Sequence, residues 1–196
     1  SSCINISHDY EGKPPLSKTR KTFMPFPRSQ LDVYILQIDP FRSIQNTPAE
    51  QLFRYWTKQD YLDEHGIPTA MGIEYFGFGR FNRLTVDISK EVRLYANHQG
   101  GYRVFCPETM SLITDVFSAS IHRWRSNDRR KQDFAVECTG CGKTHAFNTL
   151  IGRPSIAFGK GAIRLINVDQ STSDTSFLLD LEEQIGRLKI VLKRVG

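Results

Sequence analysis

Residues 138–143 read Cys-Thr-Gly-Cys-Gly-Lys, a turn in which two cysteines are separated by two residues. This spacing is typical of a zinc knuckle, and the glycine after the second cysteine lets the backbone curl so that its amides face the sulfurs. Residues 105–109, Phe-Cys-Pro-Glu-Thr, have the form of a facing knuckle whose second cysteine is replaced by Thr109. The sequence therefore predicts three thiolates at one site and leaves open the fourth ligand.

A structural zinc ion takes four ligands in a tetrahedron, and a neutral threonine hydroxyl is a poor one. His145 follows the second knuckle closely, His122 lies between the knuckles, and Glu108 is a harder carboxylate ligand that thiolate-rich sites disfavour. We therefore predict a zinc site formed by Cys106, Cys138, Cys141 and His145. The alternative is a ribbon that has lost its metal and keeps its shape by packing and hydrogen bonds.

The composition is that of an ordinary globular domain. The chain has 196 residues, 39% of them hydrophobic, a net charge of +5 and an isoelectric point near 9.1. No apolar run is long enough for a membrane span, and residues 1–10 do not resemble a secretory signal. Four cysteines are too few for a disulfide scaffold and favour a reducing, cytoplasmic setting. A Cys106–Cys138 disulfide in an oxidising compartment is the alternative.

Four prolines and several basic residues interrupt any periodicity in residues 1–30 and predict an N-terminal arm. Residues 31–196 are predicted to form a single α/β domain with a ribbon-like segment at 102–150. We expect a mostly antiparallel sheet with two to three packed helices (an α+β fold) and an embedded, degenerate zinc ribbon. Alternating or β-rich stretches predict strands at 32–38, 72–78, 82–88, 134–136 and 162–168, and a hairpin of 92–95 with 102–105.

Helices are expected at three places. Thr47-Pro48-Ala-Glu50 is a capping box with proline at the first helical position. Residues 112–124 carry apolar side chains at steps of three and four. The last helix is predicted over residues 177–195, with Asp174 as its N-cap. Its apolar stripe favours packing on the sheet, with dimerisation as the alternative; the stripe is Leu178, Leu181, Ile185, Leu188 and Leu192.

Two enzyme classes are disfavoured by the residues around the second knuckle. Gly142-Lys143-Thr144 resembles a phosphate-binding loop, but Glu137 stands where that loop needs its first glycine and would repel phosphate. A zinc deaminase needs His-x-Glu, and no histidine of this chain is followed by glutamate at that distance. We therefore expect no catalytic residues and a protein that is not an enzyme.

Nucleic-acid binding is the alternative function. The densest basic stretch follows the predicted helix 112–124, where solvated cations are also normal. Residues 75–81 mix aromatic side chains with arginine, but such glycine-spaced aromatics are more often core residues. The residues of this alternative are Arg123, Arg125, Arg129, Arg130 and Lys131.

From residue 102 onward the order of features resembles a group of small bacterial proteins with an embedded zinc ribbon. The features are Phe105-Cys106-Pro107, the second knuckle at 138–143, Ala157-Phe158-Gly159, a strand at 163–168 and a C-terminal amphipathic segment. Members of this group are largely of unassigned function, and some resemble immunity proteins carried beside secreted antibacterial toxins. The missing fourth cysteine departs from their pattern.

The resemblance implies a cytoplasmic protein that binds and occludes a cognate toxin without catalysis. No interface residue follows from the sequence, because blocking surfaces have no fixed motif. A structural subunit of a larger assembly is a further alternative, and neither the partner nor the oligomeric state follows from the sequence.

Overall fold

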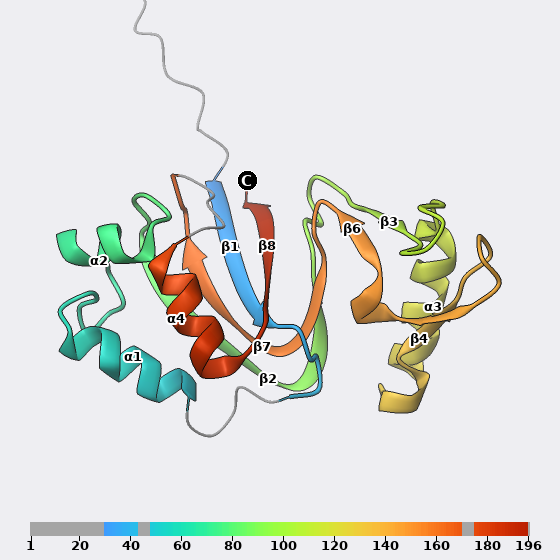
Figure 1. The fold of residues 1–196 in the computed structure, drawn as a ribbon, viewed down its shortest axis with the longest axis horizontal. Coiled ribbons are helices and arrows are strands. Elements are labelled where there is room, and N and C mark those ends of the chain that lie inside the picture. Colours follow the sequence, from blue (N-terminus) through green and yellow to red (C-terminus); the bar gives the residue numbers. More distant parts are fainter. Residues whose placement is uncertain (1–29, 43–47, 170–174, 196) are drawn as a thin grey trace, which may run out of the picture.

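The computed structural model describes residues 30–42, 48–169 and 175–195 (Figure 1). In these residues the strands are β1 (Gln30–Gln37), β2 (Arg83–Tyr95), β3 (Arg103–Phe105), β4 (Ala135–Glu137), β5 (Thr144–Ala146), β6 (Ile151–Arg153), β7 (Ala157–Ile166) and β8 (Leu188–Val195). The α-helices are α1 (Pro48–Lys58), α2 (Ala70–Phe76), α3 (Thr114–Ser126) and α4 (Ser176–Ile185).

The main sheet has the strand order β2-β7-β1-β8, and every neighbouring pair is antiparallel. Helices α1 and α2 connect β1 to β2, and α4 connects β7 to β8. This connectivity is the β-α-β-β-α-β order of the ferredoxin-like arrangement. The predicted α+β class with a mostly antiparallel sheet is confirmed.

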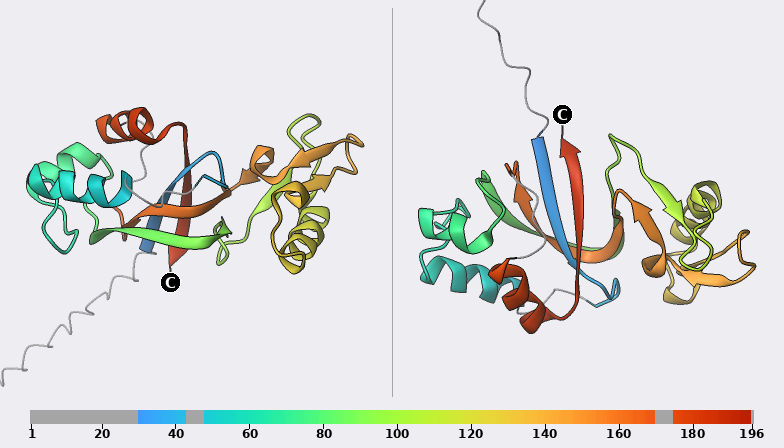
Figure 2. Two further views of the ribbon diagram at one scale, coloured as in Figure 1. Left: turned by 90° about the horizontal axis from the view of Figure 1, so that it is seen from below. Right: turned by 45° about the horizontal axis from the view of Figure 1, so that its top comes forward.

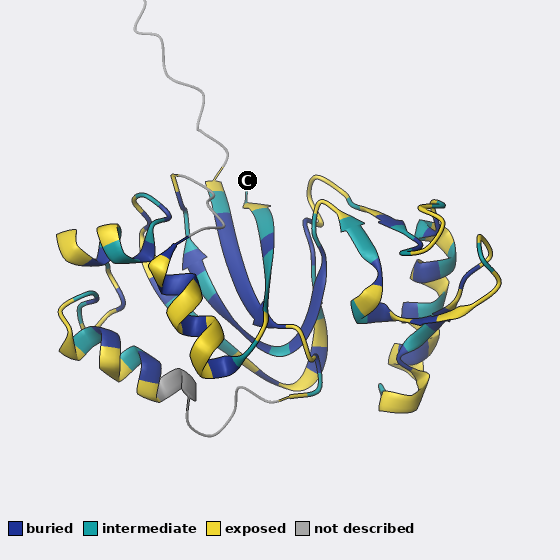
Figure 3. Cartoon of the chain, in the orientation of Figure 1, coloured by how far each residue is buried: buried dark blue, intermediate teal, exposed yellow. Residues whose placement is uncertain are grey.

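One face of the main sheet is covered by α1, α2 and α4 (Figure 2). The apolar run of β1 alternates Val33 and Ile35 into this core, and the helices add Trp56, Phe76 and Phe177, whose rings meet edge to face. Such aromatic contacts add to the large apolar area that each ring buries. Figure 3 shows that β1 is buried along almost its whole length.

Residues 96–156, called the insertion lobe below, lie between β2 and β7 and form a second body beside the sheet (Figure 1). The lobe contains α3 and two separate strand pairs, β3 with β6 and β4 with β5. Its core is a separate hydrophobic cluster centred on Phe117, Trp124 and Phe147. Val92 of β2 and Phe158 of β7 belong to this second cluster, so the two long strands reach into both cores.

The predicted strand at 72–78 is wrong, because this segment forms the short helix α2. The Thr69 side chain accepts a hydrogen bond from the Gly72 amide and caps the helix, and Gly77 ends it with a left-handed φ of 71°. A Cβ on Gly72 would lie 1.9 Å from the carbonyl oxygen of Tyr61, so the helix packs directly against backbone. These local constraints outweigh the strand preference of Ile, Tyr and Phe.

The predicted helix over 177–195 is also wrong in its second half. Helix α4 ends at Ile185, Gly186 follows with a φ of 86°, and residues 188–195 form β8 on the edge of the sheet. Leu188 and Leu192 therefore belong to a strand rather than a helical stripe, which removes the basis for dimerisation through that stripe. The spacing of four residues that suggested a helix also fits one face of a strand, and the β-branched Ile190 and Val191 favour the strand.

The predicted hairpin of 92–95 with 102–105 does not form. Residues 92–95 end β2, which pairs with β7, whereas β3 pairs with β6. The chain leaves the main sheet after residue 95 and enters the insertion lobe. The two segments therefore pair with different strands although they are close in sequence.

Other predictions fall on or near the observed elements. The strands expected at 32–38, 134–136 and 162–168 correspond to β1, β4 and β7, and the helix expected at 112–124 corresponds to α3. Pro48 begins α1 as predicted. Thr47, Asp174 and the arm residues 1–29 lie outside the described residues.

A buried ion pair joins β1 to β7. Asp32 is 1% exposed and accepts hydrogen bonds from the Arg164 guanidinium, with Nε at 3.0 Å, and from the Asn167 amide at 3.0 Å. Arg164 in turn lies over the Tyr34 ring, 5.4 Å from its centroid. Because a buried carboxylate is stable only with such partners, this cluster fixes the central strands to one another.

We expect Asp32→Ala to lower the free energy of unfolding by about 3 kcal/mol, because it leaves Arg164 and the Asn167 amide without their partner. This is the lower end for a broken buried pair, since Arg164 keeps part of its contact with water. Chemical denaturation measures the change. Glu183→Ala on the exposed side of α4 is the control and should cost less than about 0.5 kcal/mol. Equal effects of the two changes would contradict the assignment.

Candidate metal centre

Four donor side chains of the insertion lobe converge at the ends of its short strands. Strand β3 ends at Phe105 and places Cys106 directly after it, while Cys138 and Cys141 stand on the turn between β4 and β5. His145 lies in the middle of β5, opposite Val136 of β4, and is 9% exposed. Cross-strand partners point to the same side of a hairpin, so Val136 and His145 both face the lobe interior.

The donor atoms of Cys106, Cys138, Cys141 and His145 all lie within 4.8 Å of one another. The sulfurs of Cys106 and Cys141 are 3.6 Å apart. The Nε2 atom of His145 lies 3.7 Å from the Cys106 sulfur and 3.1 Å from the Cys141 sulfur. These three cysteines are free, so the alternative of a Cys106–Cys138 disulfide is not observed.

These distances fit a tetrahedral metal. With zinc–sulfur bonds of about 2.3 Å and zinc–nitrogen bonds of about 2.0 Å, a tetrahedron places two sulfurs about 3.8 Å apart and a sulfur and nitrogen about 3.5 Å apart. The observed separations depart from these values by a few tenths of an ångström. The residues could therefore hold a metal ion with small adjustments of side-chain torsions.

The surroundings of the two closest thiols favour a bound cation. Burial opposes ionisation of Cys106, but hydrogen bonds from the side chain and backbone of Thr109 and from the Glu108 backbone lower its pKa to about 6. The Lys143 backbone N–H favours the Cys141 thiolate, yet burial and the neighbouring Cys106 and Cys138 sulfurs outweigh it and raise the pKa of Cys141. A cation among the sulfurs removes this mutual repulsion.

Thr109 stands where the sequence predicted a missing fourth cysteine. In the structure it is not a ligand but hydrogen-bonds residues around the donor cluster. Its hydroxyl lies 2.9 Å from that of Ser111 and accepts from the Ser111 amide at 3.4 Å, while its hydrogen bond to Cys106 favours the thiolate. Sequence reasoning considered Thr109 only as a possible metal ligand and did not consider it as a hydrogen-bond partner of the Cys106 thiolate.

A second feature that the sequence did not reveal ties the two knuckles together. Lys143 Nζ donates to Glu108 Oε2 at 2.8 Å, which lowers the pKa of Glu108 and raises that of Lys143. A Cβ on Gly140 would lie 2.7 Å from the Ser111 side chain and 3.2 Å from the Thr109 hydroxyl. The turns therefore approach so closely that any larger residue at this position would force the Ser111 side chain or the turn to shift.

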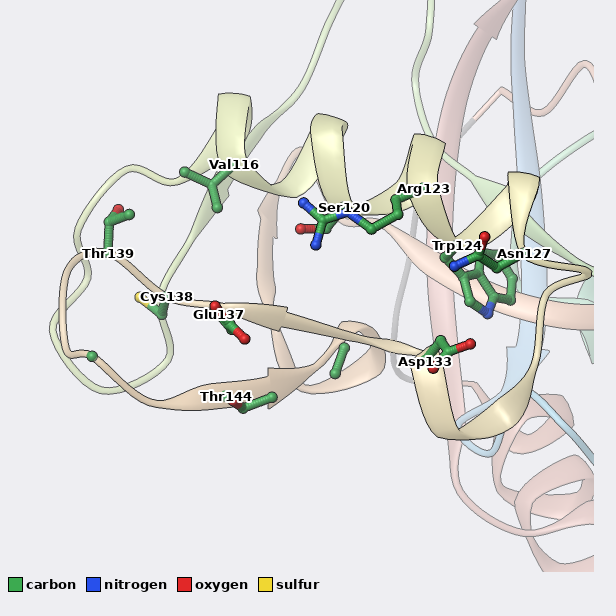
Figure 4. A pocket seen from close by; sticks show the side chains of 12 residues that line it. Val116, Ser120, Arg123, Trp124, Asn127, Asp133, Glu137, Cys138, Thr139 and Thr144 are labelled. Atoms are coloured by element: carbon green, nitrogen blue, oxygen red, sulfur yellow. The ribbon is translucent and has the colours of Figure 1, made fainter.

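The basic residues predicted for nucleic-acid binding do not form one free patch. Arg129 pairs with Glu91 of β2, and Lys131 lies over the Phe41 ring, 5.6 Å from its centroid. Arg123 lines a groove of about 580 Å³ between α3 and the β4–β5 hairpin (Figure 4). Asp133 and Glu137 line the same groove, so its charge is mixed. Arg125 and Arg130 are both exposed and form no ion pair with a carboxylate of the described residues.

His122, the other histidine of the ribbon segment, is exposed on α3 and takes no part in the donor cluster. Residues Phe76, Phe78 and Phe81 of the aromatic stretch are 0–5% exposed and belong to the main core, as the core interpretation predicts.

Comparisons with known proteins give no family match, and no curated protein or solved structure is significantly similar to the chain. Within the described residues, no helix is both long enough and apolar enough to cross a membrane.

We expect Gly140→Ala to weaken zinc binding by about 10- to 100-fold, the range found for outer-shell partners of a metal site. The added methyl would push the second knuckle away from Ser111 and separate the sulfurs. Competition against a chromophoric chelator measures the affinity.

Thr139→Ala is the matched control, because Thr139 is the exposed neighbour of Gly140 on the same turn. Its zinc affinity should stay within about twofold of the parent. A Gly140→Ala protein that also binds zinc normally would show that the close approach of the two turns is not needed.

Proposed function

We propose that the protein binds one zinc ion at Cys106, Cys138, Cys141 and His145, and that this ion has a structural role in a non-catalytic binding protein. The observation that carries the proposal is the convergence of four donor atoms within 4.8 Å. Three thiolates and one imidazole form a donor set that selects zinc among the common divalent ions of cells.

A structural role is favoured because the four protein ligands would fill the tetrahedron. A catalytic zinc keeps one position open for water or substrate. Cys106 and Cys138 are at most 2% exposed and His145 is 9% exposed, so only Cys141 has appreciable access to solvent. A zinc ion bound by these four side chains would cross-link the two knuckles.

The insertion lobe has a physical need for such a cross-link. Strands β3, β4, β5 and β6 have three residues each, and they form two separate two-stranded pairs. Isolated two-stranded pairs are marginally stable at best in water. The zinc would join the end of β3 to the β4–β5 hairpin and contribute its binding free energy to the folded lobe.

The central test compares two histidines of the same lobe. The wild-type chain should bind one zinc ion, and its cobalt(II) form should show the absorption of a tetrahedral site with three thiolates. His145→Ala should weaken the affinity by more than about 100-fold, because losing a ligand exceeds the effect of losing an outer-shell partner.

His122→Ala serves as the control, since His122 is exposed and outside the cluster. It should leave stoichiometry, affinity and the cobalt spectrum unchanged. Absence of stoichiometric zinc in the wild type would refute the site, and equal losses in the two variants would refute the ligand set.

Removal of the metal should loosen the lobe and spare the main sheet. We expect chelation to speed amide hydrogen exchange in residues 103–113 and 135–146, because these segments would lose their cross-link. Exchange in residues 33–35 of β1 and 163–165 of β7 should change little, since this ladder lies in the main sheet, away from the insertion lobe. Mass-spectrometric exchange on the whole chain distinguishes the two regions, and uniform acceleration would argue that the lobes unfold as one unit.

A further inference from the structure

A face of the insertion lobe combines paired arginines with exposed apolar side chains. Strands β3 and β6 pair antiparallel with Arg103 opposite Arg153 and Phe105 opposite Ile151. On the other side of β3, Phe105 forms an isolated antiparallel bridge with Leu112. Since cross-strand partners share one face, these side chains lie together. We call this surface the ribbon face; its residues are Arg103, Phe105, Leu112, Ile151 and Arg153.

The hydrogen bonds around β3 fix this arrangement. The Ile113 amide donates to the Val104 carbonyl at 2.8 Å, and the Cys106 amide donates to the Ser111 carbonyl at 2.9 Å. The backbone groups of Phe105 and Arg103 therefore point to β6, which makes Arg103 and Arg153 a hydrogen-bonded pair with Cα atoms about 5.5 Å apart. Val104, on the opposite side of the strand, is fully buried.

Two arginines directly opposite each other destabilise a strand pair unless something neutralises them. Both are exposed, and no carboxylate of the described residues forms an ion pair with either. The Arg153 guanidinium lies over the Phe105 ring, 5.4 Å from its centroid. The strand pair thus sets two arginines opposite each other and places one guanidinium over an aromatic ring.

The apolar row beside the arginines is open to solvent. Leu112 is 59% exposed, and Phe105 and Ile151 are half-buried. Such a row adjoining paired guanidinium groups offers contact for a flat, unpaired ring together with charge for an anion.

We propose that the ribbon face binds single-stranded nucleic acid, with successive phosphates at Arg103 and Arg153 and an unstacked base against Phe105 and the Arg153 plane. Arginine binds phosphate through its planar fork, and bases stack on aromatic rings and on guanidinium planes. Proteins that bind single strands combine these two features. A duplex keeps its bases stacked inside and could use only the arginines.

The proposal goes beyond the zinc centre and uses none of its ligands. Zinc at Cys106 would hold the residue next to Phe105, so the metal would fix the face without contacting the nucleic acid. The face also differs from the basic stretch 123–131, where Arg129 and Lys131 are engaged within the protein.

The test measures fluorescence anisotropy of labelled oligo(dT) and oligo(U) of about 15 nucleotides, a length within the site sizes of small single-strand binders. The zinc-loaded full chain should bind both at low salt and bind a matched duplex at least about tenfold more weakly. Arg103→Ala/Arg153→Ala should weaken binding at least about tenfold. It should also flatten the slope of log affinity against log salt by about 1.4, because each phosphate that is no longer neutralised removes about 0.7 from the slope.

Two further variants separate charge from stacking. Lys90→Ala/Arg187→Ala removes the same charge from exposed positions outside the lobe and should leave affinity within about twofold. Phe105→Leu keeps an apolar side chain but removes the ring. It should weaken binding about fivefold or more, the low end for one stacked base, with the salt slope unchanged.

Zinc content and thermal unfolding of each variant show whether the fold is kept, so failure of the zinc site and failure of the ribbon face are distinguished. The proposal is overturned if the zinc-loaded wild type binds no oligonucleotide at low salt, which would leave the face to a protein partner. It is also overturned if the control pair loses as much affinity as the arginine pair, or if the duplex binds as tightly as the single strands.

Discussion

The pairing of β2 with β7 is the interaction on which both halves of the molecule depend. Arg83 to Ile88 pair with Ile166 to Gly161, the register then shifts, and Arg93 to Tyr95 pair with Gly159 to Ala157. The extra residues lie on β2, and insertions of this sort bend a strand pair and increase its twist. The same two strands can therefore supply Leu84 and Leu165 to one core and Val92 and Phe158 to the other.

The insertion lobe has no comparable ladder of its own. Its strand pairs are short and separate, and its core is held by aromatic side chains from α3, from Phe134 just before β4 and from the segment before β6. The donor cluster lies where those separate pieces meet, with Cys106 following β3 and the other three donors on the β4–β5 hairpin. A metal bound at this point would join the separate parts of the lobe, as the long strands β2 and β7 join the parts of the main sheet.

The sequence was sufficient for features that depend on local chemistry. Knuckle spacing identified the three cysteines, and ligand preference selected His145 over Glu108, because both rest on residues that stand close in the chain. It was insufficient where pairing crosses long stretches: β2 meets β7 only after the insertion lobe, so nothing near residue 95 revealed its partner. The C-terminal stripe failed for another reason, since a four-residue spacing fits a strand as well as a helix and Gly186 decided between them. The role as a toxin inhibitor rests on the resemblance alone and stays a prediction.

The positions of the basic residues likewise show what local sequence can and cannot predict. The run at residues 123–131 is conspicuous in the sequence, yet the fold uses Arg129 to hold Glu91 and Lys131 to cover Phe41. Arg103 and Arg153 are inconspicuous and far apart in the chain, but the pairing of β3 with β6 sets them opposite each other. Like charges set directly opposite each other weaken a strand pair, and this arrangement supports the proposal that both side chains bind an anion. If zinc binds at Cys106 as proposed, it would hold the end of β3 beside this binding surface.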